Sequence, residues 1–202
     1  MTHRARDESG FTAAEVVMTS LLLSIVTAMV LSVLVSQTTA ERRTTAVVNS
    51  QEDVRFAMTA MVRDLRSADP MLPATTVDAA KYQVDLQLTD TGGGTSYVRW
   101  TLDAANQMLL RQTLSGPGGT VTAAKLTLKR VHNGDGAGTP IFTYYNSTGT
   151  QMTSSNATPA DLANCSIRVQ VTVTADSNPG PAPFTVASDA ELRNRLPGGV
   201  GC

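Results

Sequence analysis

The N-terminal third of the chain combines two apolar patterns. From Val16 to Val35 there are 20 residues without a charged side chain, enough for a helix to cross a bilayer. Beyond this run the apolar residues recur at helical spacing, at Val47, Val54, Met58, Met61, Val62 and Leu65. That spacing predicts an amphipathic helix with one stripe free to pack on a folded domain.

The two patterns belong to one predicted helix. Neither glycine nor proline occurs between Phe11 and Asp69, and these are the residues that most often break helices. The helix should end near Ala68, because Asp69 precedes Pro70 and the residue before a proline disfavours helical geometry.

The rest of the chain alternates apolar and polar residues with a period of two, as half-buried strands do. A DAAN turn at 103–106 predicts a hairpin, and glycine-rich loops supply turns between other strands. Strands are predicted at 82–88, 98–102, 108–113, around 126–128, at 141–145, 167–173 and 184–192. We therefore predict an α+β fold, in which the amphipathic half of the helix covers a mostly antiparallel β-sheet domain at 70–202.

One acidic residue conflicts with the apolar run. Glu15 stands directly before Val16, and an acidic side chain in the middle of a spanning helix costs about 2.5–3.5 kcal/mol. A cleaved secretory signal is the alternative to a membrane-spanning helix, although its apolar core is usually about 7–15 residues. Cleavage of such a signal would leave Glu41 as the first residue. Two arginines lie on each side of the run, so the positive-inside rule assigns no orientation.

Composition favours no particular chemistry. The 16 basic and 17 acidic side chains give a net charge of −1, whereas nucleic-acid-binding proteins usually carry a basic patch.

A catalytic triad requires a histidine held by a carboxylate, and nothing near His132 suggests one, so we expect this residue in an exposed loop. The NGDGAG segment at 133–138 has too few acids for an EF-hand and is expected to be a turn. We expect no enzyme activity, metal or cofactor.

The two cysteines, Cys165 and Cys202, form no metal-binding motif. An even number of cysteines in a domain outside the cytoplasm favours a disulfide. A buried, reduced Cys165 with a free C-terminal thiol is the alternative.

The N-terminal residues resemble those of the type IV pilin superfamily. A short hydrophilic leader at 1–10 ends in Gly10, followed by Phe11 and by Glu15 as the fifth residue after the junction. An apolar half-helix at 11–40 then continues into an amphipathic half at 41–69. The segments QEDVRFAMTAMVRDLRSAD (51–69) and FTVASDAELRNR (184–195) resemble minor pilins and minor pseudopilins of the W and J kinds.

The resemblance implies a role for three residues. A prepilin peptidase would cut between Gly10 and Phe11 and methylate the new amino group of Phe11. Glu15 would pair with the Phe11 amine of a neighbouring subunit during filament assembly. The lack of helix-breaking residues and the large, glycine-rich domain favour a minor subunit over the bulk filament protein.

We therefore expect a structural minor pilin or pseudopilin that helps to initiate or decorate a type IV pilus or a type II secretion-like filament. The implied partners are the prepilin peptidase, other pilin or pseudopilin subunits, the inner-membrane assembly platform and membrane lipid. The implied location is the cell membrane, with a single span and the β-domain outside the cytoplasm. The alternatives are a membrane-anchored β-domain that acts as an adhesin or binding module, and a secreted enzyme behind a signal peptide.

Overall fold

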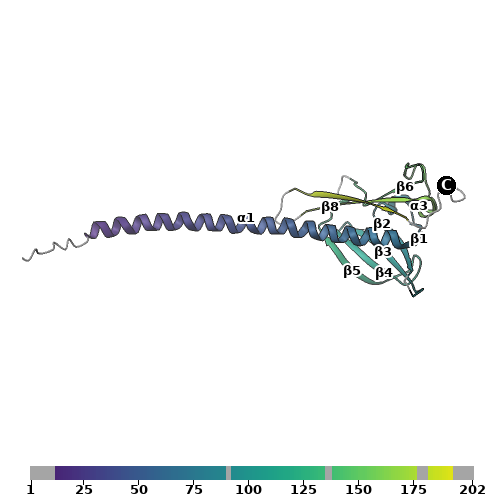
Figure 1. Ribbon diagram of the computed structural model, residues 1–202, viewed down its shortest axis with the longest axis horizontal. Coiled ribbons are helices and arrows are strands. Elements are labelled where there is room, and N and C mark those ends of the chain that lie inside the picture. The colour runs from purple at the N-terminus through teal and green to yellow at the C-terminus, as the bar shows by residue number, and fades with distance from the viewer. Residues whose placement is uncertain (1–11, 90–91, 135–137, 177–181, 193–202) are drawn as a thin grey trace, which may run out of the picture. The chain divides into compact units, whose positions relative to one another are not determined.

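The computed structural model describes residues 12–89, 92–134, 138–176 and 182–192. The chain divides into two compact units, Met1–Thr45 and Ala46–Cys202. The order of its elements can be followed in Figure 1. Their bounds are α1 Ala13–Ser67, β1 Ala68–Leu72, α2 Val77–Ala80, β2 Gln83–Thr89, β3 Thr95–Asp103, β4 Met108–Leu114, β5 Val121–Lys129, β6 Phe142–Tyr145, β7 Gln151–Met152, α3 Pro159–Cys165, β8 Arg168–Ala175 and β9 Phe184–Glu191.

The long helix is continuous, as predicted. α1 begins at Ala13 and ends at Ser67, within a residue of the expected end. Its second half buries the predicted apolar stripe, and Val54, Met61 and Leu65 are completely inaccessible to solvent. The predicted α+β fold, with a long N-terminal helix and an antiparallel β-domain, is therefore confirmed.

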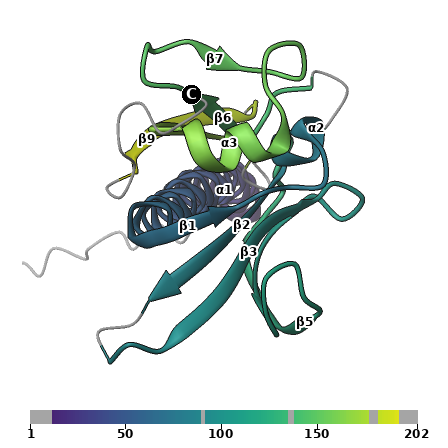
Figure 2. The ribbon, with the colours of Figure 1, turned by 90° about the vertical axis from the view of Figure 1, so that its right-hand side faces the viewer.

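The strands form two antiparallel sheets, where the sequence predicted one. Within the described residues the first sheet has the order β1-β2-β3-β4-β5 and the second has the order β7-β6-β8-β9. Figure 2 looks along α1, whose second half lies with β6 and β9 on one side and with β2 and β3 on the other. The buried stripe of α1 and the inward faces of both sheets make one hydrophobic cluster.

One charged side chain is buried beside this cluster. Asp64 of α1 is only 3% exposed, and its Oδ2 atom accepts hydrogen bonds from Trp100 Nε1 at 3.1 Å and Arg111 Nε at 2.8 Å. Trp100 and Arg111 face each other across β3 and β4, so their side chains point to the same face of the first sheet. The Asp64 carboxylate therefore ties one position of α1 to two neighbouring strands.

A second buried ion pair lies on the opposite face of the same sheet. Arg99 donates two hydrogen bonds to the carboxylate of Asp85, at 2.7 and 2.6 Å, and these bonds raise the pKa of the Arg99 guanidinium. Nearby, Tyr144 donates a hydrogen bond to the Ala80 carbonyl at 3.0 Å. Burial raises the pKa of the Tyr144 phenol far above its usual value, so the group stays neutral and keeps its donor.

Four short elements were not predicted: β1, α2, β7 and α3. Strand β1 begins directly after α1 and pairs with β2. Helix α3 has a capping box, in which Thr158 and Asp161 bond each other's backbone N–H groups. The Thr158 backbone N–H and hydroxyl both donate to the Asp161 carboxylate and lower its pKa, because they stabilise the carboxylate over the neutral acid.

The expectation for His132 was wrong. Its side chain is half-buried, and its Nε2 atom lies 3.1 Å from Asp176 Oδ2. The neighbouring Asn133 is fully buried; its amide donates to the Thr172 carbonyl and accepts from the Thr174 N–H. The side chain of Asn133 thus acts as an additional bridge to the backbone of β8, which draws this segment onto the sheet.

Candidate functional site

Glu15 lies in the first turn of α1 and is exposed. Its backbone N–H donates to the Thr12 carbonyl at 3.0 Å, so the residue is already part of the helix. A carboxylate at this position is favoured by the positive end of the helix dipole. Its exposed side chain is available to a cation from outside the chain.

The following residues leave a continuous apolar surface open. The large apolar side chains from Val16 to Val35 are 50–70% exposed, and no residue of the most apolar 18-residue window is buried. This part of α1 is long and apolar enough to span a membrane. Such a surface is far larger than the apolar patches that soluble monomers usually expose, and large exposed patches mark sites of membrane or protein interaction.

Seven hydroxyl groups of this half-helix are satisfied internally. Each of the seven donates to a backbone carbonyl three or four residues earlier on the same helix, at distances of 2.5–3.0 Å. A hydroxyl without a partner in hydrocarbon would cost several kcal/mol, and these bonds avoid that cost. The residues are Thr19, Ser20, Ser24, Thr27, Ser32, Thr38 and Thr39.

Of the other candidate residues from the sequence, the structure describes only Cys165. Gly10 and Phe11, the expected cleavage and methylation positions, lie outside the described residues. Cys165 is the last residue of α3 and is disulfide-bonded. Cys202 also lies outside the described residues, so the Cys165–Cys202 pairing stays a prediction.

Replacing Cys202 with serine should lower the free energy of unfolding by about 3–4 kcal/mol, because the predicted bond closes a loop of intermediate length. Chemical denaturation of the oxidised wild type and of the variant would measure this difference. Under reducing conditions the two proteins should become equally stable. Two alkylatable thiols in the exported wild-type protein would refute the pairing.

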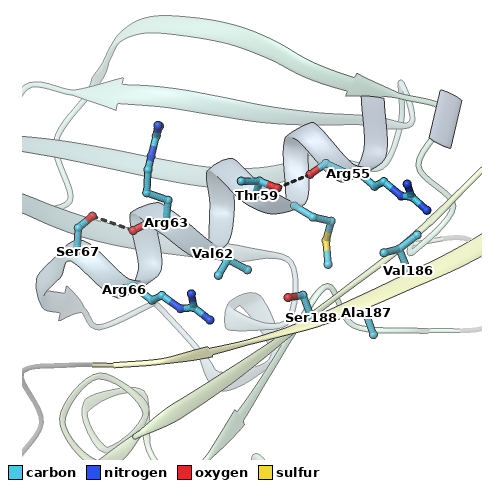
Figure 3. Close-up of a pocket in the computed structure, with 10 residues that line it drawn as sticks. Arg55, Thr59, Val62, Arg63, Arg66, Ser67, Val186, Ala187 and Ser188 are labelled. Carbon is cyan, nitrogen blue, oxygen red and sulfur yellow. Dashed lines mark hydrogen bonds between the residues drawn. The ribbon is translucent and has the colours of Figure 1, made fainter. Parts of the chain in front are cut away.

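A groove that sequence reasoning missed lies in the β-domain, between the second half of α1 and β9. It has a volume of about 830 Å³, within the usual range of about 300–1,000 Å³ for ligand sites. Figure 3 shows Val62 on the helix side and Val186 and Ser188 on the strand side. The floor is therefore largely apolar, with contributions from two elements far apart in the sequence.

Three arginines are among the residues that line this groove: Arg55, Arg63 and Arg66. Figure 3 shows Arg55 and Arg66 on the side of β9, whereas Arg63 points away from that strand. Arg66 donates to the Asp189 carbonyl of β9 at 3.3 Å, and Arg63 lies 3.8 Å from the Asp64 carboxylate. Among the described residues, no carboxylate lines the groove. The arginines recur within three turns of α1, and this spacing was the signal available in the sequence.

The contact between His132 and Asp176 belongs to the second group of polar side chains that forms a candidate site. The Asp176 Oδ1 atom is buried and makes no hydrogen bond to another described group. Gln107 Nε2 lies 3.5 Å from His132 Nδ1, on the opposite side of the ring. The described residues contain no cluster of three or more histidine, cysteine, aspartate or glutamate side chains that could hold a metal ion.

No protein-family model matches this chain, and a search of curated proteins finds no match either.

Proposed function

We propose that this chain is a non-enzymatic minor pilin or pseudopilin, inserted in the membrane as a precursor and recruited into a type IV or type II secretion-like filament. The observation that carries the proposal is the position of Glu15. It is an exposed acid in the first turn of a helix that is apolar on all sides for its first half. The same helix supplies core side chains to a β-domain in its second half.

The chemistry of assembly follows from this position. In an apolar surrounding, the Glu15 carboxylate would need a cationic partner, because an unpaired charge there is expensive. Cleavage before Phe11 would create such a cation, the new N-terminal amine, and methylation would keep its positive charge. Pairing between Glu15 of one subunit and the Phe11 amine of the next satisfies both groups and fixes the axial register of the two helices.

This role implies particular partners and a location. The prepilin peptidase would process the leader, and the inner-membrane platform would receive the inserted subunit. Other pilin or pseudopilin subunits would then cover the apolar half of α1, which lipid covers before assembly. The β-domain would lie outside the cytoplasm, where the Cys165 disulfide is stable.

Cleavage after Gly10 is the test of this function. Replacing Gly10 with leucine should leave the precursor uncut in the membrane, because a peptidase needs close access to the backbone there and a side chain obstructs it. N-terminal sequencing of the membrane fraction should find Phe11 as the first residue of the wild-type protein.

Ala40→Leu is the matched control, since a conventional signal peptidase would cut after Ala40. The control variant should still begin at Phe11. A mature protein that begins at Glu41 would contradict the proposal and favour a secreted protein. An uncut wild-type chain would contradict it in favour of a membrane-anchored binding module, a function that the groove beside β9 also allows.

A further inference from the structure

The groove between α1 and β9 borders an open sheet edge. In the four-stranded sheet β9 is the last strand, paired to β8 on one side. The Leu192 N–H donates to the Ile167 carbonyl, so the backbone groups of Leu192 point toward β8. Because neighbouring residues of a strand point their backbone groups in opposite directions, those of Ala187 and Asp189 point away from β8.

One side chain already forms a hydrogen bond with the outer edge of β9. The Asp189 carbonyl accepts a hydrogen bond from Arg66, which agrees with its outward direction. Within the described part of the chain, no strand pairs with the outer side of β9. Apart from the Asp189 carbonyl, which Arg66 already bonds, the edge offers backbone donors and acceptors in the arrangement that a further antiparallel or parallel strand needs.

We propose that this groove binds an acidic, extended segment of a partner subunit, which adds a strand beside β9. The Arg55 and Arg66 side chains lie on the side of the groove that faces β9, and no carboxylate is among the described residues that line it. Glutamate or aspartate at alternate positions of an added strand would point to one face, where the arginines can bind them with charge-assisted hydrogen bonds. Apolar residues of the strand would cover Val62 and Val186.

This inference adds a partner-binding surface to the proposed function, and it depends on neither cleavage after Gly10 nor the charge of Glu15. All of the groove residues belong to the unit Ala46–Cys202. Failure of the N-terminal processing experiment would leave the groove in place, and failure of strand binding would leave processing in place. The two results are therefore distinguishable.

The test uses the full chain in detergent micelles and a synthetic peptide that alternates glutamate with valine over eight residues, the length of β9. Two further peptides serve as probes of mechanism. One has glutamine in place of glutamate, and the other has methylated backbone nitrogens on the edge that would face β9. Binding is measured by fluorescence anisotropy, and amide exchange is measured by NMR.

We expect the glutamate peptide to bind and to slow hydrogen exchange at the outward amides of Ala187 and Asp189. The glutamine peptide and the backbone-methylated peptide should bind at least tenfold more weakly. Arg55→Gln combined with Arg66→Gln should weaken binding roughly tenfold, as expected for the loss of two exposed charge pairs. Lys125→Gln, which removes one positive charge from an exposed position on β5, is the control and should bind normally.

Three outcomes would overturn the proposal. The first is the absence of binding up to about 1 mM peptide, which corresponds to an interaction of about 4 kcal/mol. The second is binding without protection of the Ala187 and Asp189 amides, which would mean that no strand forms. The third is equal loss of binding in Lys125→Gln and in the Arg55→Gln, Arg66→Gln double variant, which would indicate general charge attraction. Unchanged fluorescence of the buried Trp100 establishes that each variant is folded.

Discussion

Replacing Asp64 with alanine should lower the free energy of unfolding of the β-domain by about 3 kcal/mol. The change would leave the Trp100 N–H without its acceptor and the Arg111 guanidinium without its counterion. Breaking a buried pair in this way typically costs about 3–5 kcal/mol, and the lower value applies because the Arg111 side chain is 30% exposed. For a domain of this size, the loss corresponds to a fall in Tm of about 6–12 °C.

Urea denaturation of the full chain in detergent, followed by fluorescence, measures this effect. Trp100 is the single tryptophan in the sequence and is fully buried at the Asp64 contact, so its emission reports unfolding there. Asp53→Ala removes the same side chain from an exposed position on α1 and should change stability by less than about 0.5 kcal/mol.

A double variant separates the ion pair from the packing around it. Asp64→Leu with Arg111→Met removes both charges and should recover most of the lost stability, because a well-packed apolar replacement for an ion pair is often neutral. If Asp64→Ala were as stable as Asp53→Ala, the Asp64 contacts would contribute nothing to folding.

Changing Glu15 to valine should leave membrane insertion and cleavage intact, yet reduce recruitment into the filament by two to three powers of ten. In the proposed assembly, Glu15 faces the Phe11 amine of a neighbouring subunit. Loss of one partner of a buried pair costs about 3–5 kcal/mol, and each 1.4 kcal/mol is about tenfold in the association constant. In a simple membrane anchor, the same change would be neutral or slightly favourable for insertion.

The measurement is co-purification with sheared filaments or with partner minor pilins, relative to the amount in the membrane fraction. Glu15→Gln removes the charge while keeping the shape, and should be impaired in the same direction. Glu41→Gln makes the same chemical change at another exposed position on α1 and should be recruited normally. Unchanged recruitment of both Glu15 variants at equal membrane abundance would mean that Glu15 is not an assembly residue.

The parts of the fold that could be predicted from the sequence are those encoded by local periodicity. The helix from Ala13 to Ser67 follows from an apolar run without glycine or proline, and the regular alternation at 167–173 lies almost entirely within β8. Helix α3 could also have been found, because Thr158, Pro159 and Asp161 form an N-terminal capping pattern. Strands β1 and β7 are short, and their existence depends on the partner strand more than on their own residues.

The candidate sites depend on contacts between residues far apart in the sequence, which local sequence patterns do not predict. Asp64 was one of several polar residues between apolar helical positions, and only the pairing of β3 with β4 brings Trp100 and Arg111 to it. His132 was expected in an exposed loop because its neighbours include glycines, whereas the buried side chain of Asn133 holds the segment against β8. The groove likewise needs α1 and β9, which are more than a hundred residues apart, to lie side by side.

The internally bonded hydroxyl groups in the first half of α1 have a consequence for movement. Since each of these serines and threonines already donates to its own helix, the segment can slide or rotate in an apolar surrounding without breaking a polar bond. Its friction against lipid tails or neighbouring helices should therefore be low and nearly uniform along its length. Its depth is then fixed by the charged residues at its two ends, Glu15 on one side and Glu41, Arg42 and Arg43 on the other.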